Sequence, residues 1–356
     1  MGRRGPGRGR RRARRYGERV TTGTLDRLLD EDLTTDPVTA GGLTNHRPMT
    51  LIALDALGAD DRRLEQFSKG YASRLAPRRP PTGTAVTVST LGSALGTGER
   101  FGDLVAYFGK EVDSAGVDAT LGRHLGILLD GVGGAAFHGL IRLGYALEHG
   151  RDRDVAAGLA YLADSAQFVQ VPPVTGGGGL GAAGLLAALR DHPRLRDRTF
   201  GATGFAHCFA EVAADPDFVE LAARVEVDEH SLAELARLTH QLYRATGDFF
   251  ELHTMTGTHA ARLVLARTPT SERAGSLVAA LVRAVGAAYV VIGTLAVDTV
   301  DDGASPPRGW PEISEALVAS DDPHVIKLGY TCRQEEQAWS DSGYRATAAA
   351  VAGLTA

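Results

Sequence analysis

A histidine and a lysine stand three residues apart near the end of the chain, at His324 and Lys327. Asp322 and Pro323 precede them and are typical of a helix N-cap and of a first helical position. We therefore expect both side chains to project from one face of a helix. Lys327 is one of only three lysines in the chain. Two interpretations stay open: a solvated first turn that carries two surface side chains, or a buried site that both side chains face.

Three further histidines occupy apolar surroundings or helix ends. His46 precedes Pro48 at the start of an apolar helix, small and apolar residues surround His138, and His253 closes an amphipathic stretch. Each could be a core histidine with a hydrogen-bond partner, or a metal ligand. Imidazoles gathered in an apolar interior suit Fe, Zn, Cu or Ni, and a site so poor in carboxylates and thiolates would need negative charge from elsewhere.

His259 follows His253 by six residues, which separates the two side chains by about 120° on an unbroken helix. They could not then share one metal ion. Either Gly257 interrupts the helix or only one of the two belongs to the site. We favour His253 and keep His259 as a reserve ligand.

Other common chemistries lack their motifs. The sequence contains no Gly-x-Ser-x-Gly, no His-Glu-x-x-His and no Cys-x-x-Cys, and it has only two cysteines. A glycine pattern at Gly179, Gly181 and Gly184 resembles a dinucleotide-binding fingerprint, but two prolines interrupt the segment before it and no alternating strands and helices flank it. We interpret this segment as a flexible loop.

The elements that must position these side chains are helices. At 356 residues and 44% hydrophobic, the chain can bury a sizeable core, and apolar residues recur at helical spacing with few convincing strands. We predict an all-α fold with Gly- and Pro-rich loops at 78–96, 168–184 and 298–308. Helices are expected at 23–31, from 44 or 45 onward, and at 102–115, 121–147 (one helix or a pair), 154–166, 204–214, 218–225, 231–253, 276–297, 313–318 and from 322 onward.

Charge and composition divide the chain into a tail, residues 1–20, and a helical domain, residues 21–356. Residues 1–19 hold nine of the 38 basic residues and one of the 43 acidic residues. Such an arm could contact nucleic acid, but it lacks interleaved aromatic residues and a recognition helix, so we interpret it as a disordered tail without a nucleic-acid partner. The apolar run 279–297 contains Arg283 and is expected to be a core helix, with no membrane partner. Few cysteines and no secretory segment favour the cytoplasm.

Four segments in order resemble the signature segments of the questin oxidase-like family, and the resemblance runs from about Gly41 to Tyr330. The segments are 44–49, 137–142, 252–259 and 322–327. The resemblance implies an oxygenase that cleaves a ring, or inserts oxygen in the Baeyer–Villiger manner, in anthraquinone-type aromatic polyketides. It also implies a non-haem iron centre, Fe(II), held by four histidines and a carboxylated lysine. Carried over by motif, these ligands are His46, His138, His253, His324 and Lys327.

A carboxylated lysine makes chemical sense of Lys327. Burial beside a metal lowers the pKa of an amine, and the neutral amine can add CO₂ to give an anionic carbamate ligand. Arg142 or Tyr145 is expected to orient the oxygens of the aromatic substrate while O₂ reacts. The substrate's identity, the reductant and the oligomeric state stay open.

Two other functions are kept as alternatives. One is an NADPH-dependent Baeyer–Villiger monooxygenase, which would need the segment Gly179 to Gly184 to bind pyrophosphate. The other is a non-enzymatic helical protein that binds a hydrophobic polyketide, with its histidines hydrogen-bonded in the core.

Overall fold

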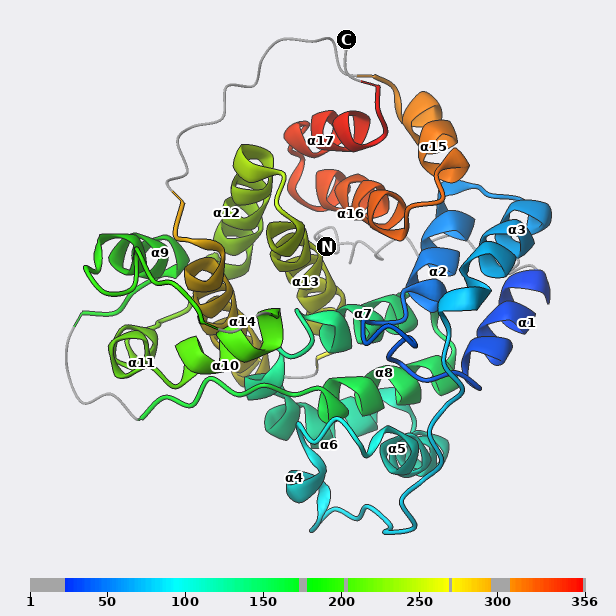
Figure 1. Ribbon diagram of the computed structural model, residues 1–356, viewed down its shortest axis with the longest axis horizontal. Helices are drawn as coiled ribbons and strands as arrows, with labels where there is room; N and C mark the ends of the chain where they lie inside the picture. The colour runs from blue at the N-terminus through cyan, green and yellow to red at the C-terminus, as the bar shows by residue number, and fades with distance from the viewer. Residues whose placement is uncertain (1–22, 173–177, 202–203, 269–270, 296–307, 355–356) are drawn as a thin grey trace, which may run out of the picture.

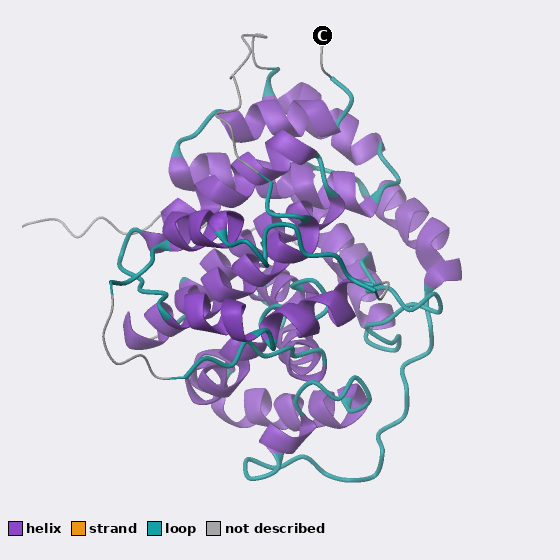
Figure 2. Cartoon of the chain, turned by 60° about the vertical axis from the view of Figure 1, so that its left-hand side comes forward, coloured by secondary structure: helices purple, strands orange, loops and turns teal. Residues whose placement is uncertain are grey.

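Helices form every regular element of the part of the chain that the computed structural model describes, which is residues 23–172, 178–201, 204–268, 271–295 and 308–354 (Figure 2). The prediction of an all-α fold is confirmed. The α-helices are α1 (Gly23–Asp32), α2 (Arg47–Leu57), α3 (Asp61–Tyr71), α4 (Leu91–Ala94), α5 (Phe101–Ala115), α6 (Val117–Leu128), α7 (His138–His149), α8 (Asp152–Asp164), α9 (Ala182–Asp191), α10 (Phe205–Ala213), α11 (Pro216–Ala223), α12 (Ser231–Thr246), α13 (Phe249–Leu265), α14 (Ser271–Ile292), α15 (Trp310–Ala319), α16 (Pro323–Trp339) and α17 (Gly343–Val351). Short 3₁₀ helices lie at Ala72–Arg74 and Leu129–Gly131. The predicted tail 1–20 lies outside the described residues, as do parts of the predicted loops 168–184 and 298–308.

Helix α7 lies in the middle of the bundle and packs against both α8 and α13 (Figure 1). Small residues permit the close approach. A Cβ atom added at Gly144 would lie 2.9 Å from the Cα of Ala260 on α13, and one added at Gly158 of α8 would lie 2.8 Å from the Cα of Leu143. Interiors packed this densely have no room for an extra methyl group without movement of the backbone. The position of α7 relative to its two neighbours is therefore fixed.

A strained turn starts α7. Ala135, Ala136 and Phe137 have φ angles of 48°, 51° and 65°, in the left-handed region that costs a residue with a Cβ atom about 1–2 kcal/mol. The fully buried ring of Phe137 pays part of this cost by packing on α13, where a Cβ atom added at Gly257 would lie 2.9 Å from its own Cβ. The stretch 121–147 is therefore a pair of helices, α6 and α7, and His138 is the first residue of the second.

The prediction of one helix over 231–253 is wrong. Helix α12 ends at Thr246 because Gly247 adopts the left-handed conformation, with φ of 61°. Asp248 then caps α13, and its carboxylate accepts hydrogen bonds from the backbone N–H groups of Phe250 and Glu251. Helix α13 continues through Gly257, so the alternative in which this glycine breaks the helix is also wrong.

Helix α14 replaces the predicted core helix 276–297, starting earlier and ending at Ile292. The part from Glu272 to Ile292 has the length and apolarity of a membrane-spanning helix, but 67% of the apolar window is buried inside the protein. Its neighbours include α9, α10 and α13. This degree of burial is what a core helix shows.

Helices α2 and α16 lie side by side (Figure 1). Each begins beside a histidine. The carboxylate of Asp322 accepts a hydrogen bond of 2.8 Å from the backbone N–H of His324, as the predicted cap requires. At α2 the side-chain oxygen of Asn45 accepts a hydrogen bond of 2.9 Å from the N–H of Arg47, and His46 occupies the residue before the helix. Both histidines are thus held by capped helix starts.

Candidate metal centre

Four imidazoles gather where the starts of α2, α7 and α16 meet the second turn of α13. We call His46, His138, His253 and His324 the histidine cluster. The ring centroid of His46 lies 4.8 Å from that of His138 and 4.6 Å from that of His324, and the rings of His138 and His253 are 4.5 Å apart. One ring nitrogen each from His46, His253 and His324 lies within 4.8 Å of the other two. Buried Lys327 is close enough for its charge to act on all four imidazoles.

Hydrogen bonds fix the orientation of three of these rings. The Nδ1 atoms of His138 and His253 each lie 2.6 Å from a backbone carbonyl oxygen, of Ala135 and Phe249 respectively, and so donate to it. Nδ1 of His324 lies 3.2 Å from the carboxylate of Asp322. An imidazole whose Nδ1 carries the proton presents a lone pair at Nε2, which is how proteins prepare a histidine for a metal.

The other ring nitrogens that point into the cluster have no protein partner. Nε2 of His138, His253 and His324 and Nδ1 of His46 are all buried and without a hydrogen bond in the described structure. Buried polar atoms are rarely left in this state, because each loses its hydrogen bonds to water without replacement. Four such nitrogens in one cluster fit the ligand set of a transition-metal ion.

The electrostatics of the cluster favour neutral ligands. Burial, and then the neighbouring imidazoles and Lys327, lower the pKa values of His46, His138 and His253. Burial and the charge of Lys327 lower the pKa of His324 to about 4, although Asp322 acts in the opposite direction. Burial also lowers the pKa of Lys327 to about 7. Neutral imidazoles bind metals without first losing a proton, and a neutral amine is available for reaction.

A comparison with known families agrees with this geometry. The profile of the questin oxidase-like family matches residues 43–332, which include the histidine cluster and Lys327. The chain belongs to the questin oxidase-like family. No curated protein matches the sequence at a significant level. Membership of the questin oxidase-like family supports an oxidoreductase and, in general terms, an oxygenase that acts on polyketides.

Arg142 and Tyr145, the residues expected to orient the substrate of this questin oxidase-like protein, both lie on α7 and are buried. Nη2 of Arg142 donates a hydrogen bond of 3.0 Å to the carboxylate of Asp32. The hydroxyl of Tyr145 lies 3.5 Å from the backbone carbonyl oxygen of Lys327, to which it donates. Both side chains thus have protein partners, and their role toward substrate stays a prediction.

Asp32, at the end of α1, is a residue that sequence reasoning missed. It is 1% exposed, and its Oδ1 accepts hydrogen bonds from the side chains of Asn45, at 2.9 Å, and Arg47, at 3.0 Å. These two residues flank His46. Because Oδ2 accepts from Arg142, one turn after His138, a single carboxylate ties together the backbone segments that hold two members of the histidine cluster. No local motif marks Asp32, since Asn45, Arg47 and Arg142 lie 13, 15 and 110 residues away in sequence.

His259, the reserve ligand, lies apart from the histidine cluster. Its Nδ1 donates to Oε1 of Glu335 at 2.7 Å, and Nε of Arg262 donates to the same oxygen at 2.8 Å. Among the residues with a described position, the rings it contacts are Tyr145 and Tyr330, each 6.3 Å away. This arrangement is a buried ion pair between α13 and α16, in keeping with the view that only one of the two histidines on α13 belongs to the site.

This ion pair should make stability depend on pH. Burial raises the pKa of Glu335, but the hydrogen bond from His259 and the charges of His259 and Arg262 outweigh it and lower the pKa from 4.5 to about 2. Since the folded pKa lies below the unfolded one, the stabilisation is fully present above about pH 4.5 and is lost as the pH falls toward 2. We expect Glu335→Gln to lower the free energy of unfolding at pH 7 by roughly 3 kcal/mol, measured by urea denaturation.

The same measurement repeated at pH 3.5 checks the cause, because the difference between wild type and Glu335→Gln should shrink there. The matched control is Glu31→Gln, which removes a carboxylate from the exposed pair of Glu31 with Arg27 and should change stability by less than about 1 kcal/mol. A loss that is equal at both pH values would contradict the assignment to this ion pair.

The glycine pattern at Gly179 and Gly181 is surrounded by negative charge. A hollow there is also lined by Glu226, Asp228 and Glu234. The carboxylate of Glu234 accepts a hydrogen bond of 3.2 Å from the backbone N–H of Ala182, the first residue of α9. A pyrophosphate needs such helix N–H groups free and would be repelled by the carboxylates. The segment Gly179 to Gly184 is therefore unsuited to bind the pyrophosphate of NADPH, as the cofactor-dependent alternative requires.

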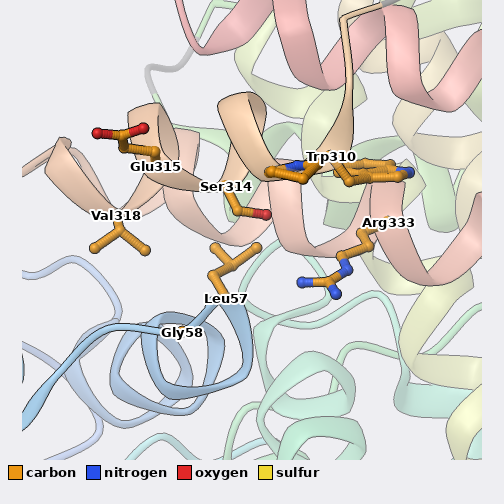
Figure 3. A pocket seen from close by; sticks show the side chains of 8 residues that line it. Leu57, Gly58, Trp310, Ser314, Glu315, Val318 and Arg333 are labelled. Carbon is orange, nitrogen blue, oxygen red and sulfur yellow. The ribbon is translucent and has the colours of Figure 1, made fainter.

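A second hollow of about 480 Å³ lies between the end of α2, α15 and α16, with Trp310 and Arg333 on one side (Figure 3). It sits beside Leu57, the last residue of α2, whereas His46 precedes the first. Its lining includes no member of the histidine cluster. Oxygenase chemistry is therefore not expected in this hollow.

Proposed function

We propose that this chain is a non-haem iron oxygenase that cleaves a ring of, or inserts oxygen into, a polycyclic aromatic polyketide such as an anthraquinone. One observation carries the proposal. Within a member of the questin oxidase-like family, four imidazoles, each with one buried ring nitrogen that has no partner, lie together near a buried lysine.

The ligands in this proposal are the histidine cluster and Lys327. Because burial lowers the pKa of Lys327 to about 7, a substantial fraction of its amine is neutral at neutral pH. The amine nitrogen can form a bond to the carbon of CO₂ and release a proton to water, which leaves an anionic carbamate oxygen. That oxygen would offset the charge of Fe(II), which four neutral imidazoles leave uncompensated. The iron, when bound, supplies the activation of dioxygen.

The protein's own groups prepare the reaction space. Backbone carbonyls of Ala135 and Phe249 hold the imidazoles of His138 and His253 in one orientation before any ligand arrives. Those two rings are almost fully buried, whereas the side chain of His324 is 25% exposed. Substrate is therefore proposed to approach from the side of His324, with water excluded from the opposite side.

Metal removal tests the proposal. Protein purified without chelator should contain near-stoichiometric iron by elemental analysis. It should take up O₂ in the presence of a hydroxylated anthraquinone. Treatment with a chelator should abolish the uptake, because the histidine cluster then offers no centre for O₂. Anaerobic addition of Fe(II) should restore it, whereas Mg²⁺, which prefers oxygen ligands, should not.

Two outcomes would overturn the proposal and favour an alternative. Chelator-treated protein that consumes NADPH together with substrate would favour the cofactor-dependent monooxygenase. Protein that binds anthraquinones stoichiometrically but holds no iron, even after incubation with Fe(II), would favour the helical binding protein. The proposal includes a cytoplasmic location with no nucleic-acid or membrane partner.

A further inference from the structure

We propose that Phe249 selects flat aromatic substrates at the histidine cluster, an inference that rests on the proposed function and names the residue that receives the substrate's ring. Phe249 is the first residue of α13 and is 46% exposed. Its ring centroid lies 4.6 Å from that of His253 and 4.8 Å from that of His324. An exposed aromatic ring thus lies directly on two members of the cluster.

Two more phenylalanines extend this apolar surface. The ring of Phe250 lies 5.3 Å from that of Phe249 at an interplanar angle of 85°, and it stacks on Phe205 at 4.7 Å and 21°. Phe250 and Phe205 are themselves only partly buried. We call these three residues the aromatic strip. It runs from α10 to the start of α13 and ends at the imidazoles.

The exposure of Phe249 matters because its ring adjoins the rings of Phe250, His253 and His324. Large hydrophobic side chains left in water forfeit the free energy that burial would give them, and exposed apolar surface beside a polar site commonly marks where a ligand binds. Among the described residues, the large hydrophobic side chains with comparable exposure are Leu43, Val88, Ile127 and Leu295, and none of these is aromatic. Among the phenylalanines, tyrosines and tryptophans of the described residues, Phe249 is the exposed one, and it lies at the candidate metal centre.

The ring geometry indicates what the occupant is. Aromatic rings pair favourably in offset-stacked or edge-to-face contacts at centroid distances of 4.5–7 Å. A flat polycyclic molecule could cover Phe249 in this way while its edge reaches the half-buried side of His324. A globular apolar molecule of similar size would cover less of the ring. The aromatic strip thus favours planar substrates over bulky saturated ones.

The side chain of Phe249 can be changed without removing the hydrogen-bond acceptor that orients His253. The hydrogen bond that orients His253 goes to the backbone carbonyl oxygen of Phe249, which every substituted residue retains. A variant at this position therefore separates recognition of substrate from retention of metal.

The experiment compares wild type with Phe249→Ala and Phe249→Tyr, and uses Ile127→Ala as a control because Ile127 on α6 is 43% exposed. Calorimetric titration with anthraquinone-2-sulfonate, a flat probe, should give a dissociation constant about fivefold to tenfold weaker for Phe249→Ala. Phe249→Tyr, which keeps the ring, and Ile127→Ala should bind as wild type does. The affinity of Phe249→Ala for adamantane-1-carboxylate, an apolar anion that is not flat, should fall by less than twofold. Iron content should be equal in all four proteins.

Unchanged affinity of Phe249→Ala for the flat probe would overturn the inference. An equal loss for both probes, or a loss of iron that accompanies the loss of affinity, would also overturn it, since Phe249 would then support the fold and not the substrate. Failure of the proposed function gives a different result. In that case the wild-type protein itself binds no iron, whatever residue stands at position 249.

Discussion

A Lys327→Met variant is expected to lose its bound iron and yet, in metal-free form, to resist denaturant better than wild type. The side chain of Lys327 is among the largest fully buried ones in the described structure. Methionine fills a similar volume but offers neither an amine nor a carbamate. With the negative charge lost, the four neutral imidazoles should hold Fe(II) at least tenfold more weakly.

The gain in stability follows from the pKa of Lys327, which burial lowers from 10.5 to about 7. At neutral pH the unfolded chain binds a proton at this amine that the folded chain binds less well, so burial of the lysine opposes folding. The penalty is fully present below about pH 7 and disappears as the pH rises toward 10.5. We expect chelator-treated Lys327→Met to be more stable than wild type by roughly 2–4 kcal/mol at pH 7 in CO₂-depleted buffer.

Urea denaturation of the metal-free proteins at pH 7 and pH 10, with elemental analysis of the untreated ones, measures both effects. The control is Lys69→Met, since Lys69 is exposed on α3 and should affect neither iron nor stability. Retention of iron by Lys327→Met would remove this lysine from the ligand set. A stability difference that persists at pH 10 would show that its charge is not the cause.

Asp32→Ala is expected to destabilise the protein by about 3–5 kcal/mol and to weaken iron binding at the same time. Removal of this carboxylate leaves Arg47 and Arg142 as buried cations without their anion, and each already has one guanidinium nitrogen with no partner among the described residues. The segments around His46 and His138 then lose their common anchor. Urea denaturation and an iron titration measure the two losses.

The chain offers a matched control in Asp36→Ala. Asp36 is also buried, at 3% exposure, but its partner Arg79 is 42% exposed and can return to water. Asp36→Ala should therefore cost less stability and leave iron affinity unchanged. The triple variant Asp32→Ala, Arg47→Met and Arg142→Met should recover much of the lost stability, because no unpaired charge is then buried. Failure of that recovery would mean that the destabilisation has another origin.

The sequence predicted those features that depend on the residues of a single helix. The Asp322-Pro323 start of α16 predicted the shared face of His324 and Lys327, and helical spacing predicted the all-α fold. The break before α13 was missed, although Gly247 followed by Asp248 is a helix stop followed by a cap.

Features that depend on distant contacts could not be predicted in the same way. Asp32 and Arg142 are 110 residues apart in sequence, and no local pattern pairs them. The left-handed turn before His138 consists of two alanines and a phenylalanine, residue types that do not favour it, and it exists because Phe137 packs against α13. The proposed ligand set required a resemblance to a family, because spacing alone left each histidine compatible with an ordinary core position.

Three of the imidazoles take their anchors from their own chain segment: His138 from three residues back, His253 from four and His324 from two. For His253 and His324, the imidazole and its anchor therefore form a local cassette whose internal geometry is set within one chain segment, whereas the anchor of His138 lies in the turn that Phe137 holds against α13. Mutation within one such segment can change the direction of its imidazole while the other imidazoles keep theirs, so a cluster of this kind can evolve stepwise. A protein designer could likewise transplant one cassette at a time into another helical bundle.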